Sequence, residues 1–117
     1  MNEDVNTSVA SAKVAVVDLL NGRGKKAHFA TEVLAGLRRS SIGKAEMDQA
    51  LGGLEAEGVV VLRDHFCADP HLAEVDLRVL VLVDHALGDQ SHAAALHEID
   101  LTWNKWLGEY LANHRCG

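Results

Sequence analysis

The sequence predicts a mainly helical α+β protein that contains one small β-hairpin. Three observations support this fold class. Apolar residues recur at helical spacing in four segments, two β-branched runs lie between the third and fourth of these, and 48% of the 117 residues are hydrophobic. A chain of this length has room for one substantial hydrophobic core, so we expect a single domain.

The first two predicted helices are separated by a basic loop. We expect residues 1–7 to be disordered and the first helix to run from about Ser8 to Leu20, because Asn21-Gly22 is a strong stop signal. The second helix is predicted from about His28 to Leu37, with Phe29 on its buried stripe. A polar turn, residues 38–41, follows it.

The third predicted helix, about 43–57, has the clearest boundaries. Gly43 is the predicted N-cap, and Gly58 is placed to end the helix in the left-handed conformation. The apolar stripe of this helix consists of Met47, Leu51 and Leu54. Their i, i+4, i+7 spacing leaves one face of the helix polar and exposed.

Two strands and a long helix are predicted for the rest of the chain. The first strand spans residues 59–65, and the second spans 74–83, where apolar residues alternate with a period of two. A helix over 70–83, starting at Asp69-Pro70, is the alternative for that segment. A break at 84–90 precedes the longest helix, which runs from Ser91 to Asn113.

Charge is distributed unevenly along the chain. The formal net charge is −6, but residues 23–44 contain six basic side chains and one acidic side chain. A local basic cluster determines electrostatic contacts more directly than the global charge does, so this window is a candidate nucleic-acid contact. A solvated basic loop is the alternative interpretation.

The order helix, helix, turn, helix, strand, strand, helix resembles the winged helix-turn-helix fold. The segment that carries the resemblance is 29–63, in which a helix ending in Leu54-Glu55-x-x-Gly58 leads into a hydrophobic strand and Arg63. Similar patterns occur in bacterial regulators of the MarR, PadR and ArsR types. The resemblance implies a winged helix-turn-helix domain at 8–83, with an added C-terminal dimerisation helix at 84–117.

The resemblance further implies a sequence-specific transcription regulator that binds double-stranded DNA through a recognition helix at about 43–57. The implied DNA-binding residues are Lys25, Lys26, Arg38, Arg39, Ser40, Ser41, Lys44, Gln49 and Arg63. Two features depart from the pattern. Glu46 and Asp48 lie near the proposed contact surface, and the predicted wing loop, HFCADPH, contains neither arginine nor lysine.

The last helix carries a broad apolar face, and we expect one small domain to cover only part of it. We expect part of this face to pack on the first helix and part to form a homodimer seam, since a palindromic site requires a two-fold axis. The predicted interface residues are Leu96, Ile99, Trp103, Trp106, Leu107 and Tyr110.

Two alternative functions remain open. The first is a winged-helix module that binds a protein partner and no DNA. The second is a metal- or redox-responsive version of the regulator, for which the candidate ligands are Asp64, His65, Cys67, Asp69 and His71. A further set resembles the interhelical metal site of some ArsR-type sensors and consists of Asp84, His85, His97 and Asp100. Neither set contains a CxxC pair, so we predict no metal and no other cofactor.

Several other classes find no support in the sequence. The longest aliphatic run is five residues, Val79–Val83, so no membrane span is predicted. The polar start and the two distant cysteines predict a cytoplasmic protein without a secretory signal or a disulfide framework. No catalytic motif is present, so we expect a protein that is not an enzyme.

Overall fold

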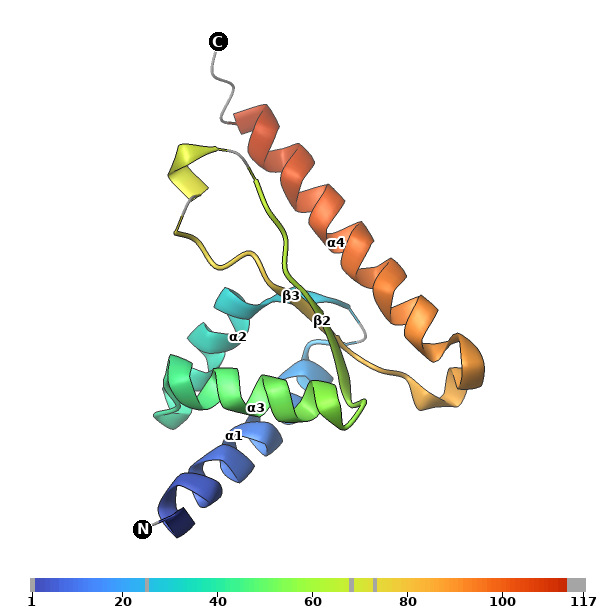
Figure 1. Ribbon diagram of the computed structural model, residues 1–117. Coiled ribbons are helices and arrows are strands. Elements are labelled where there is room, and N and C mark those ends of the chain that lie inside the picture. Colours follow the sequence, from blue (N-terminus) through green and yellow to red (C-terminus); the bar gives the residue numbers. More distant parts are fainter. Residues whose placement is uncertain (1, 25, 68, 73, 114–117) are drawn as a thin grey trace.

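The computed structural model describes residues 2–24, 26–67, 69–72 and 74–113, with side chains from residue 9 onward. The described residues form four α-helices and three strands. Figure 1 shows how these elements are arranged. They are α1 (Asn2–Gly22), β1 (His28–Phe29), α2 (Ala30–Leu37), α3 (Lys44–Ala56), β2 (Val60–Arg63), β3 (Val79–Leu82) and α4 (Ser91–Asn113). Short 3-10 turns occur at Arg38–Ser40, called η1, and at Pro70–Leu72 and His85–Gln90. Among the described residues, no helix is both long and apolar enough to cross a membrane.

The three strands form one antiparallel sheet in the order β1-β3-β2, with β3 at its centre. Helices cover both faces of this sheet. Leu80 of β3 packs into a cluster with α1, α2 and α3, whereas Val79 and Val81 pack into a second cluster with α4. Because successive side chains of a strand point to opposite faces, the four residues of β3 serve two cores.

The boundaries of α3 confirm the prediction made from its glycines. Gly43 is the N-cap in an extended conformation, and Gly58 has a φ of +75°. The Gly58 N–H donates to the Glu55 carbonyl at 3.1 Å, and the Val59 N–H donates to the Leu54 carbonyl at 2.9 Å. These two bonds form a Schellman motif, which turns the chain directly from α3 into β2.

The start of the second predicted helix is wrong. His28 and Phe29 form β1 instead, and α2 begins at Ala30, whose N–H donates to the Arg78 carbonyl at 2.8 Å. The strand exists because it pairs with β3, in the register Phe29 to Val79. A pairing partner fifty residues away leaves no signal in the local sequence, so the helical periodicity of the segment was extended too far.

The other differences concern lengths and packing. The two hairpin strands are shorter than predicted, and the helical alternative for 70–83 is reduced to the turn at Pro70–Leu72. The first helix starts at Asn2, so residues predicted to be disordered are helical; no glycine or proline interrupts residues 2–8. The long helix α4 has the predicted bounds, but it packs on the sheet rather than on α1.

Replacing Ile99 by alanine tests whether α4 belongs to the core. Ile99 is fully buried between α4 and the sheet. We expect Ile99→Ala to lower the free energy of unfolding by about 3 kcal/mol, because it leaves a cavity in a packed cluster. The measurement is urea unfolding followed by circular dichroism. The matched control is Leu101→Ala, at a side chain that is 51% exposed on the same helix, which should cost less than about 1 kcal/mol. Equal costs would contradict the packing of α4 on the sheet.

Candidate nucleic-acid interface

The predicted DNA-binding residues divide into a continuous group and a few scattered ones. Arg38 and Arg39 lie in η1, immediately before α3, and both are exposed. Ser41 has a φ of +59°, and this left-handed residue ends η1 and directs the chain into α3. We call the exposed residues of this corner the basic edge: Arg38, Arg39, Ser40, Ser41 and Lys44. Lys26 is exposed in the loop before β1, and Lys25 lies outside the described residues.

One stripe of the exposed surface of α3 consists of small or uncharged residues, with the exposed charges Lys44 and Glu55 at the two ends of the helix. Exposed residues recur at three- and four-residue spacing along it, and we call them the crest of α3: Ala45, Gln49, Gly52 and Ala56. Gln49 is the crest residue whose side chain has hydrogen-bonding groups, and its amide both donates and accepts. The crest therefore offers close approach to a partner and one polar group at its centre.

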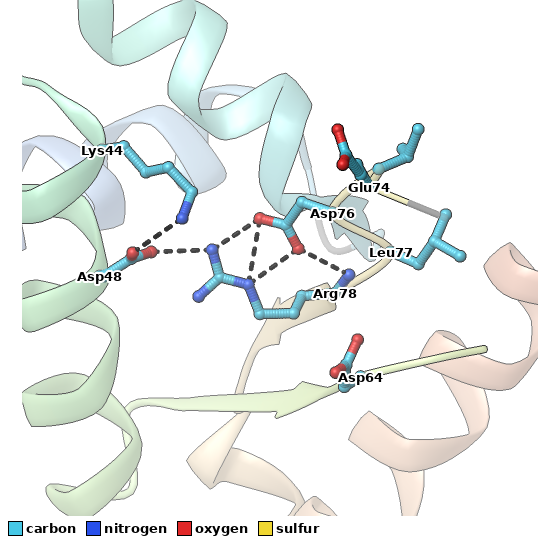
Figure 2. Close-up of a pocket in the computed structure, with 8 residues that line it drawn as sticks. Lys44, Asp48, Asp64, Glu74, Asp76, Leu77 and Arg78 are labelled. Carbon is cyan, nitrogen blue, oxygen red and sulfur yellow. Dashed lines mark hydrogen bonds and ion pairs between the residues drawn. The ribbon is translucent and has the colours of Figure 1, made fainter. Parts of the chain in front are cut away.

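An ion-pair network accounts for Asp48, one of the two carboxylates that count against nucleic-acid binding. The Lys44 ammonium donates to Asp48 at 3.2 Å, and the Arg78 guanidinium donates to the other Asp48 oxygen at 2.8 Å (Figure 2). Arg78 also donates to Asp76, from Nη2 at 2.6 Å and from Nε at 2.9 and 3.1 Å. The negative charge of Asp48 is thus directed toward two cations on the flank of α3, away from the crest.

The network shifts the pKa of Asp48, Asp76 and Arg78 toward the charged form. Hydrogen bonding to Arg78 lowers the pKa of Asp76 below its ordinary value of 3.8, against the opposing effect of burial. Partial burial raises the pKa of Asp48, but hydrogen bonds from Arg78 and Lys44 outweigh it, so the net direction is downward. The Asp76 carboxylate raises the pKa of Arg78 despite its burial. All three groups therefore stay ionised at neutral pH.

Arg78 is not among the DNA contacts predicted from the sequence, whereas Arg63 is. On β2, Val61 packs toward α4, so Arg63, two residues further on, faces the same side of the sheet. Arg78 precedes Val79 on β3 and reaches the opposite side, where α3 lies. The alternation of side chains along the hairpin places Arg63 and Arg78 on opposite faces of the sheet. That placement predicts their neighbours only when it is known which helix covers each face.

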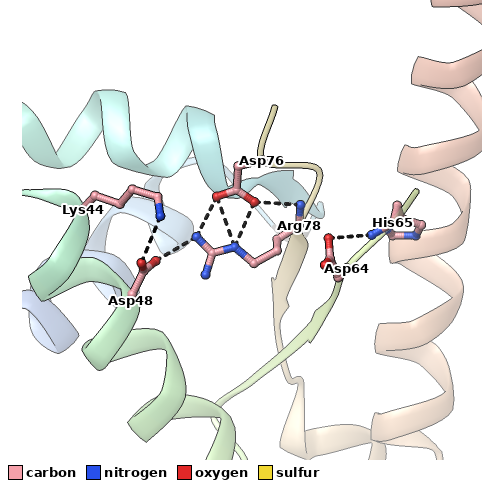
Figure 3. Close-up of polar contacts among 6 residues, drawn as sticks. All are labelled: Lys44, Asp48, Asp64, His65, Asp76 and Arg78. Carbon is pink, nitrogen blue, oxygen red and sulfur yellow. Dashed lines mark hydrogen bonds and ion pairs between the residues drawn. The ribbon is translucent and has the colours of Figure 1, made fainter. Parts of the chain in front are cut away.

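A groove of about 380 Å³ lies between α3 and the loop that joins β2 to β3. We call it the acidic groove; its lining residues are Lys44, Asp48, Asp64, Glu74, Val75, Asp76, Leu77 and Arg78. Its carboxylates outnumber its cations by four to two. Asp64 accepts the backbone N–H of His65 at 2.9 Å (Figure 3). Within the described part of the chain, neither Asp64 nor Glu74 forms an ion pair.

The residues predicted to form a dimer seam are largely occupied within the chain. Ile99 is fully buried, so its assignment to an interface is wrong. Phe29 contacts both tryptophans, with ring centroids 6.3 Å from Trp103 and 5.3 Å from Trp106. Leu96 also packs against this cluster. The aromatic face of α4 therefore packs mainly on the sheet, which includes the unpredicted strand β1.

Aromatic contacts also attach the β2–β3 loop to α4. His65 stacks on Trp103 with centroids 4.4 Å apart, and the Tyr110 hydroxyl donates to Asp69 at 2.7 Å. His65 and Asp69 were candidate metal ligands. In the described ranges, no three His, Cys, Asp or Glu side chains come together in a group that could hold a metal ion. His65 and Asp69 instead connect this loop to α4.

Comparison with protein-family models, with characterised proteins and with solved structures found no match to this chain.

Replacing Arg78 by glutamine tests the network. We expect Arg78→Gln to lower the free energy of unfolding at neutral pH by about 1–2 kcal/mol, because two partly buried carboxylates lose their shared partner. The control Lys44→Gln removes one exposed contact and should cost less than about 0.5 kcal/mol. Both are measured by urea unfolding.

The same variant has a predicted pH signature. Since the folded-state pKa values of Asp48 and Asp76 lie below 3.8, the network stabilises the protein above that pH and loses its contribution as the pH falls further. The difference in free energy of unfolding between wild type and Arg78→Gln should therefore narrow as the pH falls below 3.8. An unchanged difference would show that the loss does not arise from these carboxylates.

Proposed function

We propose that the protein is a winged-helix transcription regulator that binds double-stranded DNA. The arrangement of its elements supports this proposal. Helix, strand, helix, helix and hairpin follow in that order, and the sheet order β1-β3-β2 places the first strand beside the last. This order agrees with the winged helix-turn-helix resemblance. Under this proposal, α2 and α3, joined by η1, are the helix-turn-helix and the β2–β3 loop is the wing.

The surface of α3 is the single observation that carries the DNA-binding proposal. A recognition helix must present its exposed side to the base edges without placing negative charge next to phosphate. The crest of α3 meets this requirement, because its four residues are uncharged and because Asp48 is turned to Arg78 and Lys44. The exposed carboxylate Glu55 lies in the last turn of α3, far from the basic edge. Glu46 folds back over the helix start, with a carboxylate oxygen 2.9 Å from where a Cβ on Gly43 would stand.

The roles of the individual residues follow from this orientation. Gln49 at the centre of the crest is suited to a bidentate contact with adenine in the major groove. Arg38 and Arg39 at the basic edge are suited to phosphate oxygens, where they fix the position of the helix and make binding depend on salt. Ser40 and Ser41 add hydroxyl groups beside them.

DNA binding is tested by fluorescence anisotropy with a labelled duplex of mixed sequence over a series of salt concentrations. We expect wild-type binding to weaken steeply with salt, and Arg38→Ala or Arg39→Ala each to lower the slope of log affinity against log salt by about one. Lys105→Ala, which removes an exposed cation from α4, is the control and should leave the slope unchanged. Absence of salt-dependent wild-type binding at low salt would reject this function and favour a module that binds a protein partner.

We propose further that the regulator is a homodimer whose seam follows one flank of α4. Leu107 and Leu111 are four residues apart on the helix, neither belongs to the two core clusters, and Leu111 is 52% exposed. Leu107 belongs to the predicted interface, and Leu111 extends it beside Tyr110, on the side that the sheet leaves uncovered. A two-fold axis along this flank would present two copies of α3 to a palindromic site.

Sedimentation equilibrium tests the dimer. The expected mass is twice that of the 12.6 kDa chain. Leu111→Glu should shift the equilibrium toward monomer, because it places a charge in an apolar seam. Val14→Glu is the control, since Val14 is at least as exposed but lies on α1, which packs on the other face of the sheet from α4. A monomeric wild type, or equal effects of the two variants, would contradict this seam.

A further inference from the structure

We propose that DNA docks on the basic edge and crest alone, and that Asp64 and Glu74 hold the duplex away from the wing. This inference rests on the proposed DNA-binding function and specifies the surface that the nucleic acid occupies. In an ordinary winged helix, both the recognition helix and the wing flank the DNA backbone. Here, the space between them is the acidic groove, and its charge is the wrong sign for phosphate.

The basic edge carries positive charge that is free to meet phosphate. Arg38 and Arg39 are both exposed, and neither forms an ion pair within the described part of the chain. They stand at the N-terminal end of α3, beside the uncharged crest. Charge complementarity therefore favours this corner of the molecule for the DNA backbone.

The acidic groove offers the opposite. Its two cations, Lys44 and Arg78, are already bound to the carboxylates of Asp48 and Asp76. Asp64 and Glu74 remain without a cationic partner among the described residues, so a phosphate in the groove would meet uncompensated negative charge. The Debye length is about 8 Å at physiological ionic strength, so salt does not remove repulsion within a groove of this size.

The rest of the wing supplies no positive charge that would offset Asp64 and Glu74. The sequence from Asp64 to Leu77 contains no lysine or arginine. Arg63, at the base of the wing, faces the side of the sheet that α4 covers. The loop is also attached to α4 through the stacking of His65 on Trp103 and the hydrogen bond from Tyr110 to Asp69. The wing is therefore held against α4, and the negative charge of the wing opposes contact with DNA.

Neutralising Asp64 and Glu74 tests the inference. The variant is Asp64→Asn/Glu74→Gln, which removes no ion pair between described residues and should fold normally, as checked by circular dichroism. Its control is Asp100→Asn/Glu109→Gln, which makes the same change in net charge at exposed positions on α4. We expect the groove variant to bind a mixed-sequence duplex at least about threefold more tightly than the control variant at low salt, with the ratio falling as salt rises.

The outcomes separate this inference from the function on which it rests. A wild-type protein that shows no salt-dependent binding overturns both. Wild-type binding that depends on Arg38 and Arg39, together with equal affinities of the groove variant and its control, overturns the inference and leaves the function standing. Arg63→Ala provides a second test, and it should leave the salt slope unchanged. A loss of slope equal to that of Arg38→Ala would place DNA against the wing and overturn the inference.

Discussion

The structure depends on the central strand β3 being covered on both faces. Four residues separate two hydrophobic clusters, with Leu80 on one side and Val79 and Val81 on the other. Because a strand directs alternate side chains to opposite faces, neither cluster can be lost without exposing half of the strand. A sheet of such short strands would be marginal alone, so α4 and the helices α1 to α3 are both needed to keep it folded.

The covering of the sheet has consequences for the surfaces that remain. The aromatic side chains of α4 are taken up by Phe29 and by the β2–β3 loop, which leaves Leu107 and Leu111 on a flank for other contacts. On the opposite side, Arg78 extends from the end of the loop to Asp48 and so connects the hairpin to α3. The same contact turns a carboxylate of α3 away from the crest. One arginine thus determines both the position of the hairpin and the charge that α3 presents.

Much of the fold could be predicted from local patterns. The ends of α3 followed from Gly43 and Gly58, and the bounds of α4 from its periodicity after the break at Gly88. β1 could not be predicted, because two residues become a strand only through pairing with β3. The basic edge is visible as a run of charges, whereas the acidic groove joins residues of α3 to residues up to 34 positions later in the chain, from Lys44 to Arg78. Asp48 was read as evidence against DNA binding because its partner Arg78 is distant in sequence.

The helices, the hairpin and the cluster of arginines before α3 follow from local patterns of periodicity, glycine conformation and neighbouring charges. Contacts between distant parts of the chain set which carboxylates are neutralised, which face of the sheet each arginine lies on and which side of α4 is buried. This is because the neutralisation and the burial of a side chain depend on which residues lie next to it in the folded chain. Asp48 and Asp64 are the same residue type, but one meets Arg78 across the fold, whereas the other accepts only a backbone N–H in the described part of the chain.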